Sequence, residues 1–422
     1  MANTKILKKY LTDGEDSYLR SSNNNGKVIM LSGKWGSGKT YFWQQEIQKV
    51  LNDKDKKIPN HYVSLYGKTS IQEIKNEIFL KVFESVDSYE VIEKGKALAK
   101  NTVGLATSFF GAISVLGVNL DLSKITDKPF EKLENVLDDN KLKKTIEYLN
   151  SGAIICFDDF ERKSKDIDLN DLFGFITQLT LNFDCKVVII LNDDVFEGVE
   201  KDVFSNVKEK SVSKFLKYQP SIRDLFKSII FQKNSEEEFK YSKLRKYLKV
   251  ILKTIEETQE LNARIYIQVL DNLVEWIKNK DKSDDVLRCL ILVNMNFILY
   301  HTIFSIREIN KISKEKESNN YLYHLEKLFN RGYNYLYNPS DHIGYLEVEN
   351  FGIYLSKMIE KVINEKDSSE ERVKEKKQFI EDNLILFKSD YFANKLDISK
   401  NVDDNTFQKI NNFIETGILI NE

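Results

Sequence analysis

One short segment constrains this chain more than any other. Residues 33–40 read GKWGSGKT and satisfy every fixed position of the phosphate-binding pattern G-x-x-x-x-G-K-[ST]. The apolar run VIML at 28–31 precedes the segment, and a helical pattern follows it. Glycines allow such a loop to turn its backbone N–H groups toward a polyphosphate, and the following helix adds the positive end of its dipole. The sequence therefore predicts a strand, a phosphate-binding loop and a helix in succession.

Two side chains of this loop carry the expected chemistry. Lys39 is predicted to reach the β- and γ-phosphates of a nucleotide, and the Thr40 hydroxyl is predicted to ligate Mg²⁺. A glycine-rich turn that matches the pattern by chance is the alternative, and the flanking strand and helix argue against it. The expected nucleotide-binding residues are Gly33, Trp35, Gly36, Ser37, Gly38, Lys39, Thr40 and Tyr41.

The composition is that of a soluble globular protein. The chain has 422 residues, enough for two or three domains, and 41% of them are hydrophobic and 30% charged. The net charge of −2 does not indicate a nucleic-acid-binding surface. The three cysteines and four histidines lack metal-ligand spacing, and the N-terminus lacks the apolar segment of a signal peptide. We therefore expect a cytoplasmic protein with reduced thiols.

Apolar strands alternate with amphipathic helices over the first half of the chain. The pattern predicts an α/β fold, a three-layer P-loop NTPase domain with a parallel sheet over residues 1–233, with a helical insert at about 84–150. Strands are predicted at 28–31, 62–66, 153–157 and 187–191, with a weaker candidate at 228–231, and helices at 39–52 and 70–83.

The second half is expected to be helical throughout. No glycine occurs from Val199 to Arg331, and Pro220 is the one proline in that span. Glycines return at 331–352, which marks a predicted boundary. We therefore expect a helical, lid-like domain at 234–330 and a helical C-terminal domain at 331–422, whose helices offer a surface for a partner protein.

An uncharged segment of 20 residues, 101–120, leaves two interpretations open. Its length is sufficient to span a bilayer, which predicts membrane association. Its glycines and polar residues give it modest hydrophobicity, which favours a buried or self-associating helical insert and a soluble protein.

Carboxylates follow the third predicted strand directly. Asp158 is expected to orient Mg²⁺, and Asp159 is expected to position or deprotonate an attacking water. The alternative is a helix N-cap and a turn. Asn192 follows the next strand and is the candidate for contact with the γ-phosphate or the water, although it also fits a cap of the following helix.

The loop G-x-W-G-S-G-K-T and the string FDDFER at 157–162 together resemble the KAP family of P-loop NTPases, a branch related to AAA+ and STAND ATPases. Phe160 and Glu161 stand where that family usually has Leu and Asp. The resemblance implies a family arginine at Arg162, which either pairs with Glu161 or reaches a nucleotide in a neighbouring subunit. It also implies a second sensing arginine at Arg264, for which a surface position on an amphipathic helix is the alternative.

The resemblance covers about residues 5–275 and has consequences for function. It implies an ATP- and Mg²⁺-dependent hydrolase that works as a switch or motor, is able to form a homo-oligomer, and fits bacterial antiphage defence. It also keeps the membrane alternative open, because family members often carry transmembrane helices between the loop and the acidic strand. A nucleotide-gated scaffold with little turnover is the second functional hypothesis.

Overall fold

The computed structural model describes residues 3–53, 58–86, 110, 139–196, 198–232, 239–301, 389, 392–393 and 396–420. The chain divides into two compact units, Met1–Ser221 and Ile222–Glu422. The domain boundaries expected from the sequence, at 233/234 and 330/331, remain predictions, and the second of them lies outside the described residues.

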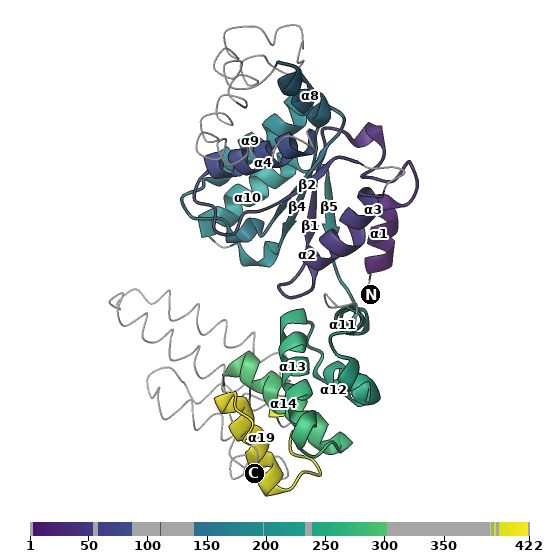
Figure 1. Ribbon diagram of the computed structural model, residues 1–422. Helices are drawn as coiled ribbons and strands as arrows, with labels where there is room; N and C mark the ends of the chain where they lie inside the picture. The colour runs from purple at the N-terminus through teal and green to yellow at the C-terminus, as the bar shows by residue number, and fades with distance from the viewer. Residues whose placement is uncertain are drawn as a thin grey trace, which may run out of the picture. The chain divides into compact units, whose positions relative to one another are not determined.

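A five-stranded sheet forms the centre of the first unit (Figure 1). Its order is β2-β3-β4-β1-β5, and every neighbouring pair is parallel. The strands are β1 (Val28–Ser32), β2 (Asn60–Ser64), β3 (Ile154–Asp158), β4 (Lys186–Leu191) and β5 (Lys214–Lys217). Every residue of β1, β3 and β4 is buried, as expected for strands covered on both faces. The predicted parallel α/β domain is confirmed.

Helices cover both faces of this sheet (Figure 1). One face packs against the helices that follow β2, β3 and β4, namely α4 (Ile71–Val86), α8 (Asp139–Asn150), α9 (Leu169–Phe183) and α10 (Gly198–Ser211). The other face packs against α1 (Thr4–Thr12) and the helix after the phosphate loop, which consists of α2 (Lys39–Tyr41), a π-helical segment η2 (Phe42–Ile47) and α3 (Gln48–Leu51). Short 3₁₀ turns complete the unit: η1 (Ser22–Asn24), η5 (Phe160–Arg162) and η6 (Asp193–Val195).

Most of the predicted helical insert, including all of segment 101–120 except Phe110, lies outside the described residues. Phe110 is described, and its ring packs edge-on against Phe175 and Phe183 of α9 at centroid distances of 5.3 and 6.1 Å. Among the described helices, none combines the length and the apolar character needed to cross a bilayer.

The described part of the second unit is helical, as the sequence predicted. Its elements are α11 (Ile222–Ile230), η7 (Ser242–Tyr247), α12 (Leu248–Thr258), α13 (Ala263–Asn279), α14 (Asp284–Tyr300) and α19 (Asp404–Thr416). They share one apolar core, in which residues 289–296 of α14 are all buried. The candidate strand at 228–231 is wrong, because residues 228–230 form the end of α11 and Phe231 lies in the turn after it. The apolar residues of that helix recur at 222, 225, 226, 229 and 230, which is helical spacing.

Candidate nucleotide-binding site

The phosphate loop joins the end of β1 to the start of α2, and three of its glycines are required by the backbone. Gly36 and Gly38 have φ values of 73° and 90°, left-handed conformations that other residues rarely adopt. A Cβ atom on Gly33 would lie 2.8 Å from the carbonyl oxygen of Tyr218, so a side chain cannot be accommodated without a shift of the chain. The pattern recognised in the sequence therefore describes a real constraint on the loop.

Lys39 lies inside the loop. Its side chain is only 9% exposed, and Nζ donates hydrogen bonds to the carbonyl oxygens of Gly33 at 2.5 Å and Lys34 at 3.1 Å. The loop thus holds an ammonium group among its own backbone atoms, at the position from which it can meet a bound phosphate. Ser37 is also buried, and its Oγ donates to the carbonyl of Lys34 at 2.7 Å.

Thr40 and Asp158, the two expected metal ligands, are in direct contact. Thr40 Oγ1 donates a hydrogen bond of 2.5 Å to Asp158 Oδ2, across 118 residues of sequence. The Asp158 side chain also accepts from the backbone N–H of Asp159 at 2.7 Å. Burial raises the pKa of the Asp158 carboxyl above its ordinary value, although these hydrogen bonds act in the opposite direction. A cation beside this carboxylate would offset the cost of its burial.

The residues present fit Mg²⁺. A threonine hydroxyl and a carboxylate are hard oxygen donors of the kind that Mg²⁺ prefers. Nucleotide phosphates and water would supply the remaining ligands of a magnesium ion held there.

Asp159 stands beside this pair in a constrained conformation. Its φ of 53° is left-handed, which is uncommon for a residue other than glycine and costs conformational energy. Its Oδ2 accepts a hydrogen bond from Ser64 Oγ at 2.9 Å, and its Oδ1 forms an ion pair with Arg162 at 3.4 Å. Contacts with two side chains therefore hold the carboxylate of the candidate base in its orientation.

Arg162 pairs with Asp159, not with Glu161. Its guanidinium also lies over the ring of Tyr66, 3.8 Å from the centroid. Glu161 instead accepts a hydrogen bond of 2.6 Å from the indole nitrogen of Trp35 in the phosphate loop. Of the two roles that the sequence left open for Arg162, the structure gives no support to the pair with Glu161, and the role toward a neighbouring subunit stays a prediction.

Asn192 follows β4, between the loop after β1 and the acidic end of β3 in the sheet order. Its side chain is 6% exposed and accepts a weak hydrogen bond of 3.4 Å from the backbone N–H of Asp194. The capping interpretation of this residue is therefore confirmed, while its contact with a γ-phosphate stays a prediction. A further contact at this edge, from the Ser32 hydroxyl to the Asp193 carboxylate, joins the end of β1 to the turn after β4.

Tyr41 and Arg264, two other predicted site residues, lie in α2 and α13. Tyr41 ends α2, and burial, with the charge of Glu46, raises the pKa of its phenol. Arg264 lies in the first turn of α13 in the second unit, where its backbone N–H is capped by the side chain of Asn262 at 3.0 Å. Their roles toward a nucleotide stay predictions.

Sequence reasoning missed the contribution of β2. Tyr62 donates a hydrogen bond of 2.9 Å to Asp158 Oδ2, Ser64 holds Asp159, and Tyr66 stacks on Arg162. These three residues alternate along the chain. Tyr62 and Ser64 lie in β2 opposite Cys156 and Asp158 of the acidic strand, and Tyr66 follows two residues after the end of β2. The alternation was visible in the sequence, but the adjacency of the two strands was not.

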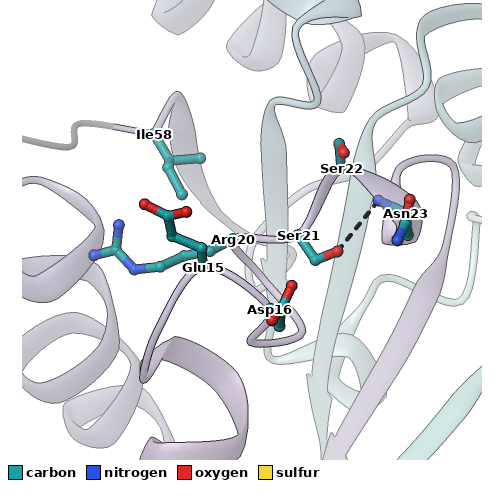
Figure 2. A pocket seen from close by; sticks show the side chains of 7 residues that line it. All are labelled: Glu15, Asp16, Arg20, Ser21, Ser22, Asn23 and Ile58. Carbon is teal, nitrogen blue, oxygen red and sulfur yellow. Dashed lines mark hydrogen bonds between the residues drawn. The ribbon is translucent and has the colours of Figure 1, made fainter.

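A pocket of about 530 Å³ lies at the other end of the sheet (Figure 2). The chain before β1 and Ile58, which lies just before β2, form this pocket. It is therefore remote from the carboxyl ends of the strands. Its lining residues are Glu15, Asp16, Arg20, Ser21, Ser22, Asn23 and Ile58. The Arg20 guanidinium donates to the carbonyl oxygens of Thr12 at 3.1 Å and Val50 at 2.9 Å, so it ties α1 to α3.

The parallel sheet, the loop after β1 and the acidic end of β3 define a P-loop nucleotide-binding domain. The model of the KAP family P-loop domain matches residues 16–315, and this chain belongs to that family. A solved structure of Drosophila ORC bound to DNA is similar at 14% identity and a TM-score of 0.27, over 96% of this chain and 84% of that one. Comparison with curated proteins finds no relative.

Proposed function

We propose that this chain binds ATP with Mg²⁺ and hydrolyses it as a molecular switch or motor. One observation carries the proposal: the hydroxyl that follows the phosphate-loop lysine lies 2.5 Å from a buried carboxylate, and a second carboxylate stands next to it. That arrangement offers oxygen ligands for a metal ion and, at the next residue, a carboxylate able to activate water.

Each residue has a distinct task in this proposal. Lys39 neutralises charge on the phosphates, and Thr40 with Asp158 holds Mg²⁺, which supplies further charge stabilisation when bound. Asp159 positions or deprotonates the attacking water. Arg162, Asn192 and Arg264 complete the site in this chain or in a neighbouring copy. An oligomeric assembly and a role in bacterial antiphage defence belong to the same proposal and depend on family resemblance.

ATP is the proposed nucleotide even though the sequence NKLD at 394–397 matches a guanine-reading pattern, N-K-x-D. That stretch belongs to the second unit rather than to the sheet that carries the phosphate loop. We expect GTP to compete weakly with ATP for binding. Equal affinity for the two nucleotides would contradict this assignment of the base.

The Asp159→Asn variant tests hydrolysis. It retains the size and polarity of the side chain but removes the base, so we expect ATP binding to persist while turnover falls by about 10²- to 10⁴-fold. Asp171→Asn, an exposed aspartate on α9, is the matched control and should keep native turnover. Native turnover in Asp159→Asn would exclude this residue as the base.

A nucleotide-gated scaffold is the second candidate, and one observation favours it. Asp159 is engaged by Ser64 and Arg162, which restrains the group that would activate water. A native protein that binds ATP but turns it over no faster than Asp159→Asn would support the scaffold. Mass measurements with and without ATP and Mg²⁺ would show whether either form assembles.

A further inference from the structure

The phosphate loop makes a second contact with the acidic segment, separate from the contact between Thr40 and Asp158. Trp35 lies in a turn in which the backbone N–H of Ser37 donates to the carbonyl of Lys34 at 3.2 Å. Its ring is 50% exposed, yet its indole N–H is directed at Glu161 Oε1, 2.6 Å away. A large aromatic residue at the surface of a phosphate loop is thus held by one polar contact.

The hydrophobic core holds the turn that carries Glu161. It belongs to η5, whose first residue, Phe160, is completely buried and packs edge-on against Phe173 of α9 at 5.4 Å. Burial raises the pKa of the Glu161 carboxyl, opposed by a backbone hydrogen bond, the Trp35 indole and the charge of Lys39. The carboxylate therefore stands near both the outer turn of the loop and its lysine.

We propose that Trp35 and Glu161 form a clasp that positions the phosphate loop for nucleotide binding. The inference depends on the proposed function, because it concerns the same loop. A flexible loop loses conformational entropy when it closes around a phosphate, and a contact that holds it beforehand reduces that loss. The same 3₁₀ turn carries Arg162, which pairs with Asp159, so the clasp also connects the loop to the group that activates water.

Three variants distinguish the effect of losing the hydrogen bond from the effect of losing side-chain volume. Trp35→Phe keeps an aromatic ring but removes the N–H, and Glu161→Ala removes the acceptor. Each should raise the Kd for ATP about tenfold, the value of one charge-assisted hydrogen bond. Glu161→Gln keeps an acceptor oxygen without the charge and should raise the Kd less than Glu161→Ala does.

The double variant Trp35→Phe/Glu161→Ala measures the coupling. If the two residues act through one contact, the double variant should bind ATP no more weakly than the weaker single variant. Multiplied effects, about a hundredfold in total, would show that the residues act independently and would overturn the clasp. Thermal unfolding of each variant shows whether it folds.

Fluorescence gives a readout that a general loss of stability would not produce. Trp43 and Trp276 are 0% and 1% exposed, whereas Trp35 is half exposed, so acrylamide should quench mainly Trp35. The quenchable signal is the difference between the native protein and Trp35→Phe. It should change when ATP is added, and Glu161→Ala should alter it without nucleotide. A Trp35 signal that is unaffected by Glu161→Ala would contradict the contact.

Lys39→Ala, measured in parallel, distinguishes failure of this inference from failure of the proposed function. If Lys39→Ala loses ATP binding while Trp35→Phe retains native affinity, only the clasp is overturned. If Lys39→Ala binds ATP as the native chain does, the proposed nucleotide site itself is wrong, and the clasp fails with it.

Discussion

The two ends of the parallel sheet both bury basic side chains, but in different surroundings. At the carboxyl end, Lys39 lies inside a glycine-rich loop, close to the contact between Thr40 and Asp158. At the amino end, Lys186 is 3% exposed, and its Nζ donates to the carbonyl of Leu19 at 3.1 Å, while Arg20 ties α1 to α3.

The two ends of the sheet thus differ in role: residues at the carboxyl end serve function, and residues at the amino end serve stability. The carboxyl end combines a left-handed aspartate, two adjacent carboxylates and a buried ammonium, an arrangement that is costly unless a ligand uses it. The amino end uses its charged groups to connect chain segments. Changes at the carboxyl end should therefore affect nucleotide binding, and changes at the amino end should affect unfolding.

The largest effect is expected for Lys39→Ala. Charge-assisted hydrogen bonds contribute about 1.5–3 kcal/mol, so loss of this ammonium should weaken ATP binding by about 100-fold. The free energy of unfolding should change by less than about 1 kcal/mol, because burial of the ammonium group has a desolvation cost that its hydrogen bonds to the carbonyl oxygens of Gly33 and Lys34 offset. Calorimetric titration with ATP measures the first quantity and urea unfolding the second.

Arg20→Ala should show the opposite pattern. It removes hydrogen bonds from a charged group to two backbone carbonyls, and we expect a loss of about 2 kcal/mol in the free energy of unfolding. Its ATP affinity should stay within about twofold of native. A large loss of affinity without a loss of stability would connect the pocket of Figure 2 to the nucleotide site and break the comparison.

Lys186→Met should change how stability depends on pH. Burial lowers the pKa of this ammonium to about 8 in the folded protein, below its unfolded value. The unfolded chain therefore binds more protons above pH 8, and this group makes the protein more stable as pH rises through that range. After discounting for solvent screening, we expect a contribution of about 1 kcal/mol, which the methionine variant should lack. Urea unfolding of both proteins at pH 7.5 and 9.5 checks the difference.

The smallest effect is expected for Tyr62→Phe. The tyrosine hydroxyl donates to Asp158 and lowers the pKa of that carboxyl, so its removal should raise this pKa further. The acidic limb of the kcat/KM profile should move to higher pH by less than about one unit. A limb that moves to lower pH would show that Tyr62 does not act on Asp158.

The local parts of the site were predictable from the sequence. The phosphate loop and the acidic string are contiguous motifs. The backbone conformation and the chemistry of each are determined by a few neighbouring residues. The contribution of β2 was not predictable, because Tyr62 and Ser64 reach the carboxylates only if β2 pairs with β3 in the observed register. Sheet order is decided by packing of the whole domain.

The wrong strand at 228–231 has a related cause. A four-residue apolar run is compatible with a buried strand and with one face of a helix. The spacing of the apolar residues over the longer window from Ile222 to Ile230 favours the helix, which begins just after Pro220. The fifth strand is instead β5, a four-residue edge strand in which Lys214, Phe215 and Lys217 are exposed, so it lacked the apolar run that marked the others.

If the loop and the acidic strand form one composite site for ATP and Mg²⁺, the native chain should release phosphate from ATP with Mg²⁺ but not with excess EDTA. We expect turnover that requires the metal and falls by at least about 100-fold in Asp159→Asn, which still binds ATP. Turnover that persists in EDTA, or that is the same in the native chain and in Asp159→Asn, would contradict it.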